Sequence, residues 1–342
     1  EIHADYLYLN AHKLGGVRMK PIIVVIDSGI DAMIVENETR DILNKGQYDK
    51  CGHGTACAMV IKSIVPTANI ISIPLLDESA RATSDELEYV LEYCCEVNCH
   101  IVNLSLSVSN LHTRKLEKIC NQLKTQGKVI VSSVTNRELT SIPANYDTVL
   151  GVRGKVFSSP FTYWFNNRRE IQLITDMTPV FTDFRLNRYF MFSGNSKAAA
   201  VASGLIGSYF SNEFVENSRE LIHYMEKKRA KSNWGKLTLK SQLGEILAPT
   251  VIEERELKTI REKIYPLIKK YIMLDQEFSE NDVLFDLGMI TEITVQELFK
   301  GLSELFEIEV NLQNMMPKDI VSINNIAIAI KRICSEQGRR YV

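Results

Sequence analysis

The sequence predicts an α/β protein in two parts, a doubly wound parallel sheet followed by a smaller all-α domain of four helices. Two observations support this prediction. From Pro21 onward, short β-branched runs alternate with amphipathic helical patterns, and after residue 254 only helical stripes recur. The length of 342 residues agrees with two domains, because a domain typically takes about 150 residues.

The first half of the chain shows the alternation most clearly. β-branched runs predict strands, and the segments between them repeat apolar residues at helical spacing. The expected strands are 22–26, 70–73, 101–105 and 129–131, and the expected helices are 53–65, 84–97 and 111–126. This rhythm is typical of a parallel sheet with helices on both faces.

The next hundred residues are less regular. A strand at 148–152 precedes an aromatic-rich stretch at 157–167, and further strands are expected at 171–174 and 189–192. A helix of small residues then begins at Ser196. Small side chains allow such a helix to pack closely against the sheet, so these elements are expected to complete the first domain.

The domain limits follow from changes in character along the chain. We expect the first domain at 19–230 and the helical domain at 255–342, where apolar stripes recur at three-to-four-residue spacing. Residues 231–254, interrupted by glycine and proline, are typical of a linker. Residues 1–18 stand apart as an N-terminal extension, and the sequence leaves open whether they are a tag remnant, a linker or a processing segment.

The composition excludes several classes of function. Forty-two acidic and forty basic side chains give a formal net charge of −2, which argues against nucleic acid or anionic lipid as a partner. The apolar runs are far shorter than the roughly 18 residues of a membrane span, and no secretion signal is visible at the start. We therefore expect a cytoplasmic protein with no membrane contact.

Seven scattered cysteines are an odd number, which favours reduced thiols over a disulfide framework. Cys94, Cys95 and Cys99 lie close to His100 in the sequence, so a zinc site is one possible interpretation. However, Cys94 falls on an apolar helical face, and no second pair of ligands completes four-fold coordination. Buried packing is therefore the favoured interpretation, and neither a metal nor another cofactor is expected.

Three motifs contain the residue types of nucleophilic catalysis. Asp27 follows a buried strand, His53 begins a helix in a His-Gly-Thr motif, and Ser196 begins a helix in a Gly-Asn-Ser-Lys motif. A fixed carboxylate can hold one histidine tautomer, and that imidazole can take the proton of a serine. Each motif alone is typical of a turn, a loop or a helix cap. Together they predict an active site.

The three motifs resemble those of the subtilisin-like serine proteases, in that family's chain order of Asp, His and Ser. The resemblance covers roughly residues 20–230 and implies a subtilisin-like fold with Asp27, His53 and Ser196 as catalytic triad. It also implies that Asn136, which follows the buried run at 129–131, donates a hydrogen bond to the oxyanion.

The resemblance further implies a set of substrate-binding residues. One segment is expected to pair with the substrate backbone, and others are expected to surround the side chain before the cleaved bond. These residues are Ser105, Leu106, Ser107, Ser133, Thr135 and Ser141. Thr135 and Ser107 stand where the family usually has glycine, and Asn195 stands where it has threonine. Thr135 and Ser141 would narrow and polarise the first pocket, which predicts a small or unusual residue there.

The C-terminal domain resembles an acyl or peptidyl carrier protein in the segment 282–288, the helix 293–306 and the segment 319–322. Carriers bear phosphopantetheine on a serine at the start of their second helix, where this chain has Met-Ile-Thr-Glu at 289–292. We expect Thr291 to be a helix N-cap. The resemblance therefore implies a carrier-like domain without a phosphopantetheine arm.

The sequence thus predicts a serine endopeptidase that cleaves a specific peptide or protein through an acyl-enzyme. Carrier-like domains occur in peptide assembly, so removal of a leader from a ribosomally made peptide is the expected role, with a pathway protein as partner of the C-terminal domain. This role rests on analogy of fold. Two alternatives remain open: a non-catalytic peptide-binding module, and a carrier component of peptide biosynthesis.

Overall fold

A computed structural model describes residues 19–49, 51–106, 114–135, 141–184, 188–212, 214–215, 217–239, 256–270, 278–287, 289–291, 294–311 and 313–340. The chain divides into two compact units. The first comprises Glu1–Met177 and Gly194–Gly235, and the second comprises Thr178–Ser193 and Lys236–Val342. None of the helices within the described ranges is long and apolar enough to cross a membrane.

The first unit contains an eight-stranded sheet in the order β2-β3-β1-β4-β5-β6-β8-β7. All its pairings are parallel except that of β7 with β8. The strands are β1 (Ile22–Asp27), β2 (Glu38–Thr39), β3 (Asn69–Pro74), β4 (Ile101–Leu104), β5 (Val129–Ser133), β6 (Leu150–Lys155), β7 (Trp164–Phe165) and β8 (Leu173–Asp176). The two-residue strands β2 and β7 were not predicted, because so short a segment shows no periodicity.

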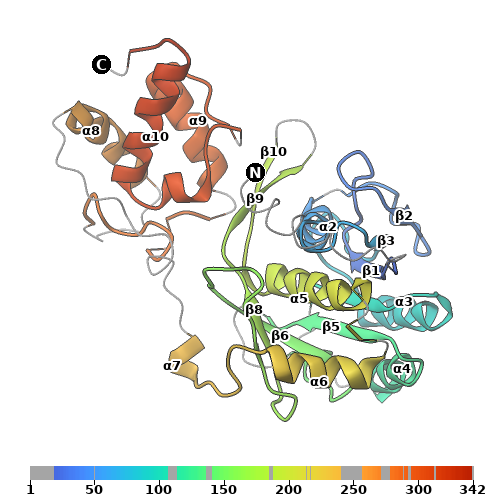
Figure 1. The fold of residues 1–342 in the computed structure, drawn as a ribbon. Coiled ribbons are helices and arrows are strands. Elements are labelled where there is room, and N and C mark those ends of the chain that lie inside the picture. The colour runs from blue at the N-terminus through green and yellow to red at the C-terminus, as the bar shows by residue number, and fades with distance from the viewer. Residues whose placement is uncertain are drawn as a thin grey trace. The chain divides into compact units, whose positions relative to one another are not determined.

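Helices lie on both sides of this sheet (Figure 1). They are α2 (His53–Ile64), α3 (Ser84–Glu96), α4 (Arg114–Thr125), α5 (Gly194–Ser211) and α6 (Ser218–Lys228). Helices α3 and α4 share a hydrophobic core with Val24 and Ile26 of β1. Helix α5 covers the other face, where a Cβ on Gly207 would lie 3.0 Å from Cδ1 of Ile23. The doubly wound sheet predicted from the sequence is confirmed.

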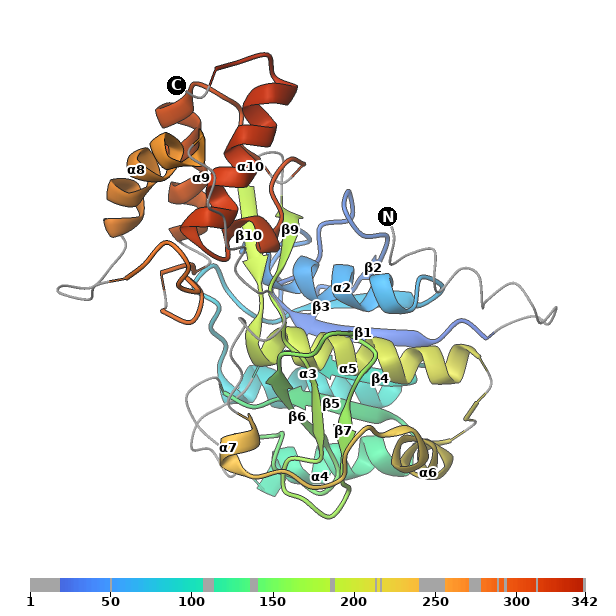
Figure 2. The ribbon, with the colours of Figure 1, turned by 60° about the vertical axis from the view of Figure 1, so that its left-hand side comes forward.

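Helices α2 and α5 pack on each other, and Figure 2 shows both helices beside β1. A Cβ on Gly204 of α5 would approach Cβ of Ile64 in α2 to 2.9 Å, so only glycine allows this close crossing. Both helices begin at the edge of the sheet where the parallel strands end. His53 and Ser196, which stand in their first turns, are therefore brought to the same edge as Asp27.

The cysteine-rich segment packs into the first unit. Cys94 and Cys99 belong to the core formed by α3 and α4, and burial raises the pKa of Cys99 to about 11. The Nδ1 atom of His100 accepts the N–H of Ile22 at 3.0 Å. These thiols and this ring nitrogen are thus engaged in packing and backbone hydrogen bonding.

The second unit contains α7 (Lys236–Leu239), α8 (Glu256–Lys269), α9 (Thr294–Phe306), the 3₁₀ helix η2 (Pro317–Ile320) and α10 (Ile323–Glu336). Helices α8, α9 and α10 bury their apolar faces in one core, which includes Ile260, Leu298 and Ile330. Three helices of more than ten residues are thus described in this unit, and a fourth stays a prediction.

A β-hairpin also belongs to the second unit. Strands β9 (Val180–Phe184) and β10 (Arg188–Phe192) pair antiparallel, and their apolar residues join the helical core. Met191 is buried there, and the Phe181 ring meets Phe299 of α9 edge-on at 5.7 Å. The sequence analysis placed this segment in the first domain, because no local pattern reveals that its partners lie more than a hundred residues further along the chain.

Candidate active site

Asp27 is the last residue of β1 and its side chain is fully buried. Its Oδ1 atom accepts the backbone N–H of Ser28 at 2.8 Å and lies 2.8 Å from Nδ1 of His53. A buried carboxylate is stable only when such donors compensate for its lost hydration. When the imidazole is neutral, the hydrogen bond to Asp27 keeps its proton on Nδ1, so that Nε2 carries the lone pair.

The chain before His53 is held by a second buried carboxylate. Asp49 accepts the N–H groups of Gly52 and Thr55, each at 2.8 Å, the Thr55 hydroxyl at 2.7 Å and the Ser28 hydroxyl at 2.8 Å. It thereby satisfies donors at the N-terminus of α2 and ties that turn to the end of β1. The sequence analysis missed Asp49, although an acidic residue just before a helix is a recognisable signal.

Gly54 brings α2 into contact with the end of β1. A Cβ at this position would lie 2.1 Å from the Gly29 carbonyl oxygen and 3.1 Å from Cβ of Asp27. Such distances are far below van der Waals contact. Glycine is therefore the residue that allows His53 and Asp27 to approach each other.

Replacing Gly54 with alanine is expected to disrupt the site. The start of α2 must move away from β1, which separates His53 from Asp27. We expect kcat/KM for a peptide substrate to fall by more than about 100-fold and the free energy of unfolding to fall by about 1–3 kcal/mol. Gly235→Ala, at a position with open space within 4 Å, is the matched control. Normal activity in Gly54→Ala would contradict this account.

The electrostatics of the pair favour a charged imidazole. Burial opposes protonation of His53, but the adjacent Asp27 carboxylate outweighs burial and raises the pKa of His53 well above its usual value of 6.5. The neighbouring Cys57 is itself buried, which raises the pKa of its thiol to about 11. Cys57 is therefore a neutral thiol at neutral pH and adds no charge to the pair.

The donor atoms of Asp27, His53 and Cys57 all lie within 4.8 Å of one another, so this group has the composition of a metal site. The Cys57 sulfur is 3.7 Å from Oδ2 of Asp27 and 4.0 Å from Nδ1 of His53. A metal there would need a deprotonated thiol and would break the bond between Asp27 and His53. The hydrogen-bonded pair is therefore the arrangement that the chemistry favours.

Ser196 lies in the first turn of α5 and contacts the end of β4. Its hydroxyl donates to the Ser105 carbonyl at 3.0 Å, and the Ser105 hydroxyl donates to the Ser196 carbonyl at 3.1 Å. Strands β4 and β1 are neighbours in register, with Leu104 opposite Ile26. Ser105 therefore follows β4 where Asp27 ends β1, and its hydroxyl also accepts the side-chain N–H of Asn103 at 3.0 Å.

Comparisons with known proteins agree with this geometry. The chain matches the family model described as the subtilase family over residues 18–232. It belongs to the subtilase family. Among curated relatives, the subtilase region is 24% identical over 237 residues to a thermostable alkaline protease of Halalkalibacterium halodurans, covering 63% of this chain and 65% of that protein. It is also 24% identical over 202 residues to a thermophilic serine proteinase of Bacillus sp. strain AK1, covering 54% of this chain and 50% of that protein.

Two solved structures resemble the subtilase fold. A lanthipeptide protease superposes with a TM-score of 0.55 at 17% identity, covering 63% of this chain and 81% of that one. A cold-adapted subtilisin-like serine proteinase superposes with a TM-score of 0.52 at 16% identity, covering 60% and 81%. The chain spans between half and two thirds of the length of the curated relatives named above.

Of the substrate-binding residues expected from the resemblance, Ser105 is the one that exchanges hydrogen bonds with Ser196 among the described residues. Ser105, Ser133 and Ser141 are buried, and Leu106 and Thr135 are half-buried. The N–H of Thr135 donates to the Ser141 hydroxyl at 3.1 Å, so the two residues expected to narrow the first pocket are in contact. Ser107 and Asn136 lie outside the described residues.

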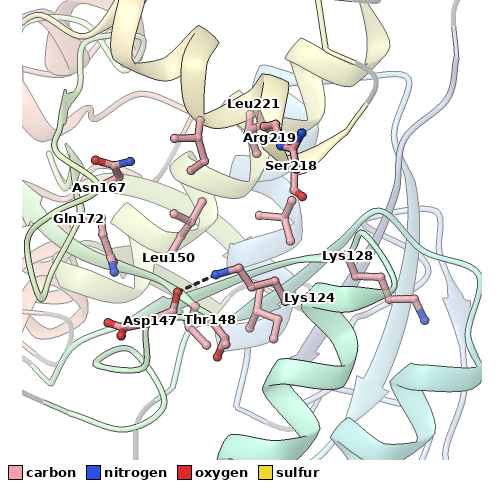
Figure 3. A pocket seen from close by; sticks show the side chains of 14 residues that line it. Lys124, Lys128, Asp147, Thr148, Leu150, Asn167, Gln172, Ser218, Arg219 and Leu221 are labelled. Atoms are coloured by element: carbon pink, nitrogen blue, oxygen red, sulfur yellow. Dashed lines mark hydrogen bonds between the residues drawn. The ribbon is translucent and has the colours of Figure 1, made fainter.

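Two cavities in the subtilase unit lie at opposite edges of the sheet. One, of about 450 Å³, is lined by Ser28 and Leu76, beside the carboxyl ends of β1 and β3. The other, of about 380 Å³, lies at the amino ends of β5 and β6. Lys124 donates to the Asp147 carbonyl at 2.9 Å on one side of this cavity, and Arg219 lies on the opposite side (Figure 3). This second cavity contains none of the predicted site residues.

Proposed function

We propose that the subtilase unit is a serine endopeptidase with Asp27, His53 and Ser196 as its triad. One observation carries the proposal: the 2.8 Å hydrogen bond between buried Asp27 and His53, at the sheet edge where Ser196 is hydrogen-bonded to the chain beside β1. A buried carboxylate that orients an imidazole next to a serine is the arrangement of a nucleophilic hydrolase.

In this mechanism the Ser196 hydroxyl turns from the Ser105 carbonyl toward His53. Its oxygen attacks the scissile carbonyl while Nε2 of His53 takes the proton, and Asp27 stabilises the imidazolium. Asn136 and the Ser196 N–H stabilise the oxyanion. The C–N bond then breaks, and His53 returns the proton to the leaving amine. Water repeats the sequence on the acyl ester and releases the acid and free Ser196.

Labelling by a fluorophosphonate tests this proposal directly. The probe forms a covalent bond only with an activated serine, so we expect one adduct, located at Ser196 by peptide mass spectrometry. Labelling should be lost in His53→Ala as well as in Ser196→Ala. A wild-type protein that stays unlabelled while it still binds an extended peptide would instead support the non-catalytic binding module.

We further propose that the substrate is a ribosomally made peptide precursor from which a leader is removed. The likeness to a structure described as a lanthipeptide protease supports this class of substrate. The cytoplasm, where such precursors are made, is the proposed location, and seven free cysteines suit its reducing conditions. Incubation with precursor peptides encoded near the gene should give two fragments of defined mass, whereas digestion of unrelated proteins would contradict a specific role.

The first pocket is expected to favour a small residue before the cleaved bond. Thr135 and Ser141 are joined by a hydrogen bond. Their side chains would narrow the pocket and make it polar, and both effects disfavour a bulky apolar side chain. Profiling with a peptide library should show preference for small residues at this position. A preference for large aromatic side chains would contradict the prediction.

We propose that the C-terminal unit is a carrier-like domain that binds a pathway protein and bears no pantetheine arm. The Thr291 hydroxyl accepts the N–H of Thr294 at 3.2 Å, and Oγ1 of Thr294 accepts the N–H of Thr291 at 2.8 Å. Thr291 is thus engaged as a helix cap. Treatment with a pantetheinyl transferase and coenzyme A should add no mass, and an adduct on Thr291 would contradict the proposal.

A further inference from the structure

The cavity at the amino ends of β5 and β6 has the size and lining of a small-molecule site. Its volume of about 380 Å³ falls within the range of ligand pockets, roughly 300–1,000 Å³. Six apolar residues line it: Val129, Ile130, Val149, Leu150, Leu221 and Ile222. Polar side chains lie among them at a few positions (Figure 3). Apolar walls with a few placed polar groups are typical of a ligand-binding site.

Gln172, which lines this cavity, has a buried side-chain amide with one end unused. The residue is only 6% exposed, and Figure 3 shows its side chain on the cavity wall with the nitrogen at the tip. Its Oε1 atom accepts the N–H of Gly151 at 2.8 Å. Its Nε2 atom has no hydrogen-bond partner among the residues that the structure describes, although buried polar groups normally have one. A ligand with an acceptor atom supplies the missing partner.

Lys124 brings a positive charge into the same cavity (Figure 3). Its Nζ atom donates to the Asp147 carbonyl at 2.9 Å, which uses one of the three donors of an ammonium group. Within the described part of the chain, no carboxylate pairs with it. Nζ of Lys128, by contrast, donates to the carbonyls of Cys94 and Cys95 at 2.7 and 2.9 Å. Lys124 is therefore the lysine of this cavity that can bind an anion.

The opposite side of the cavity is also electropositive. Helix α6 begins there with Ser218 and Arg219, and the first turn of a helix carries a partial positive charge. Among the residues that line the cavity, three are basic and one, Asp147, is acidic. This balance of charge favours an anionic group on the ligand, and the apolar walls favour an apolar group attached to it.

We propose that this cavity binds a small apolar carboxylate. The carboxylate accepts hydrogen bonds from Nζ of Lys124 and Nε2 of Gln172, and the apolar group packs against Leu150 and Leu221. A carboxylate has two oxygens and can serve both donors at once. One ammonium and one neutral amide suit its single charge better than the charge of a phosphate, which is close to −2 at neutral pH. The same chemistry occurs in a free acid and in the C-terminal residue of a peptide.

Calorimetric titration of the full chain tests the ligand class. The probes are octanoate, N-acetyl-leucine and a short peptide that ends in leucine, each compared with its neutral amide. Ser196→Ala protein is used so that the peptide stays intact. We expect one-to-one binding of at least one acid, weakened by about 10-fold or more in its amide. Binding of the free acids identifies a small molecule as the source, and binding of the peptide alone identifies a peptide end. Failure of all three acids, or equal binding of the amides, would overturn the inference.

Two further substitutions test whether binding occurs in this cavity. Gln172→Glu keeps an acceptor for the Gly151 N–H but replaces the nitrogen donor with an oxygen. Lys124→Gln keeps a donor for the Asp147 carbonyl but removes the charge. Each is expected to weaken binding of the tightest acid by about 10-fold or more. Lys118→Gln, at another exposed position of helix α4, is the matched control and should leave binding unchanged. If Gln172→Glu does not fold, the exposed Lys124→Gln carries the test. Unchanged acid binding in Lys124→Gln would overturn the inference.

The result is independent of the proposed peptidase function, because the cavity contains none of the triad residues. In a chain that retains Ser196, Lys124→Gln should therefore leave fluorophosphonate labelling and peptide cleavage unchanged. Loss of acid binding with normal labelling confirms the cavity as a separate site. A wild-type protein that binds the acid but stays unlabelled would refute the peptidase and leave this inference intact.

Discussion

Ser196→Ala is expected to abolish peptide cleavage while leaving the protein folded. The substitution removes the oxygen that attacks the scissile carbonyl in the proposed mechanism, so no acyl-enzyme can form. A loss of kcat on the order of 10⁶ is expected, which is the value known for subtilisin, another member of the same family. Single-turnover assays with a chromogenic peptide would measure it, together with loss of the fluorophosphonate adduct.

The cost in stability should be small, since alanine removes one hydrogen bond, to the Ser105 carbonyl. A neutral bond of this kind contributes about 0.5–1.5 kcal/mol to the free energy of unfolding. Ser208→Ala, which removes a hydroxyl from the same helix outside the site, is the matched control and should retain full activity. Cleavage that persists in Ser196→Ala would contradict the proposed nucleophile.

Asp27→Asn is expected to reduce kcat by about 10⁴-fold, because the amide no longer holds His53 in the required tautomer. The pH profile gives an independent readout. The Asp27 carboxylate raises the pKa of His53, and a general base acts only when neutral. In the wild-type protein, kcat/KM should therefore rise through a pKa well above 6.5.

Without the carboxylate, the imidazole loses its proton at lower pH, and the rising limb of the Asp27→Asn profile should shift in the acid direction. Asp31→Asn provides a matched control, since Asp31 is also buried near the end of β1 and accepts the N–H of Met33. The pH profile of kcat/KM for Asp31→Asn should match that of the wild-type protein. An unshifted limb in Asp27→Asn would show that Asp27 does not set the pKa of His53.

The sequence predicted those features that depend on local patterns. Strands such as β1 and helices such as α2 follow from periodicity. Asp27, His53 and Ser196, the residues of the proposed triad, stand in short motifs at element ends, so their placement at one sheet edge follows from parallel topology. Asp49 was missed although its place before α2 carries a signal.

Other features depend on contacts between distant segments. The side chain of Asn195 is hydrogen-bonded to residues 60 and 41 positions away, and nothing in its local sequence distinguishes it from a helix cap. The burial of Met191 among the helices of the second unit likewise depends on packing. Such long-range pairings are fixed by tertiary structure and not by local propensity.

The β9–β10 hairpin makes the C-terminal unit discontinuous along the polypeptide. A shortened chain that stops after Gly235 would keep Phe181 and Met191 but lose the helices against which they pack, and two apolar side chains would face water. Truncation of the chain after Gly235 is thus expected to yield a fragment that aggregates. To produce the first unit alone, the hairpin must also be replaced by a short polar turn between Met177 and Gly194.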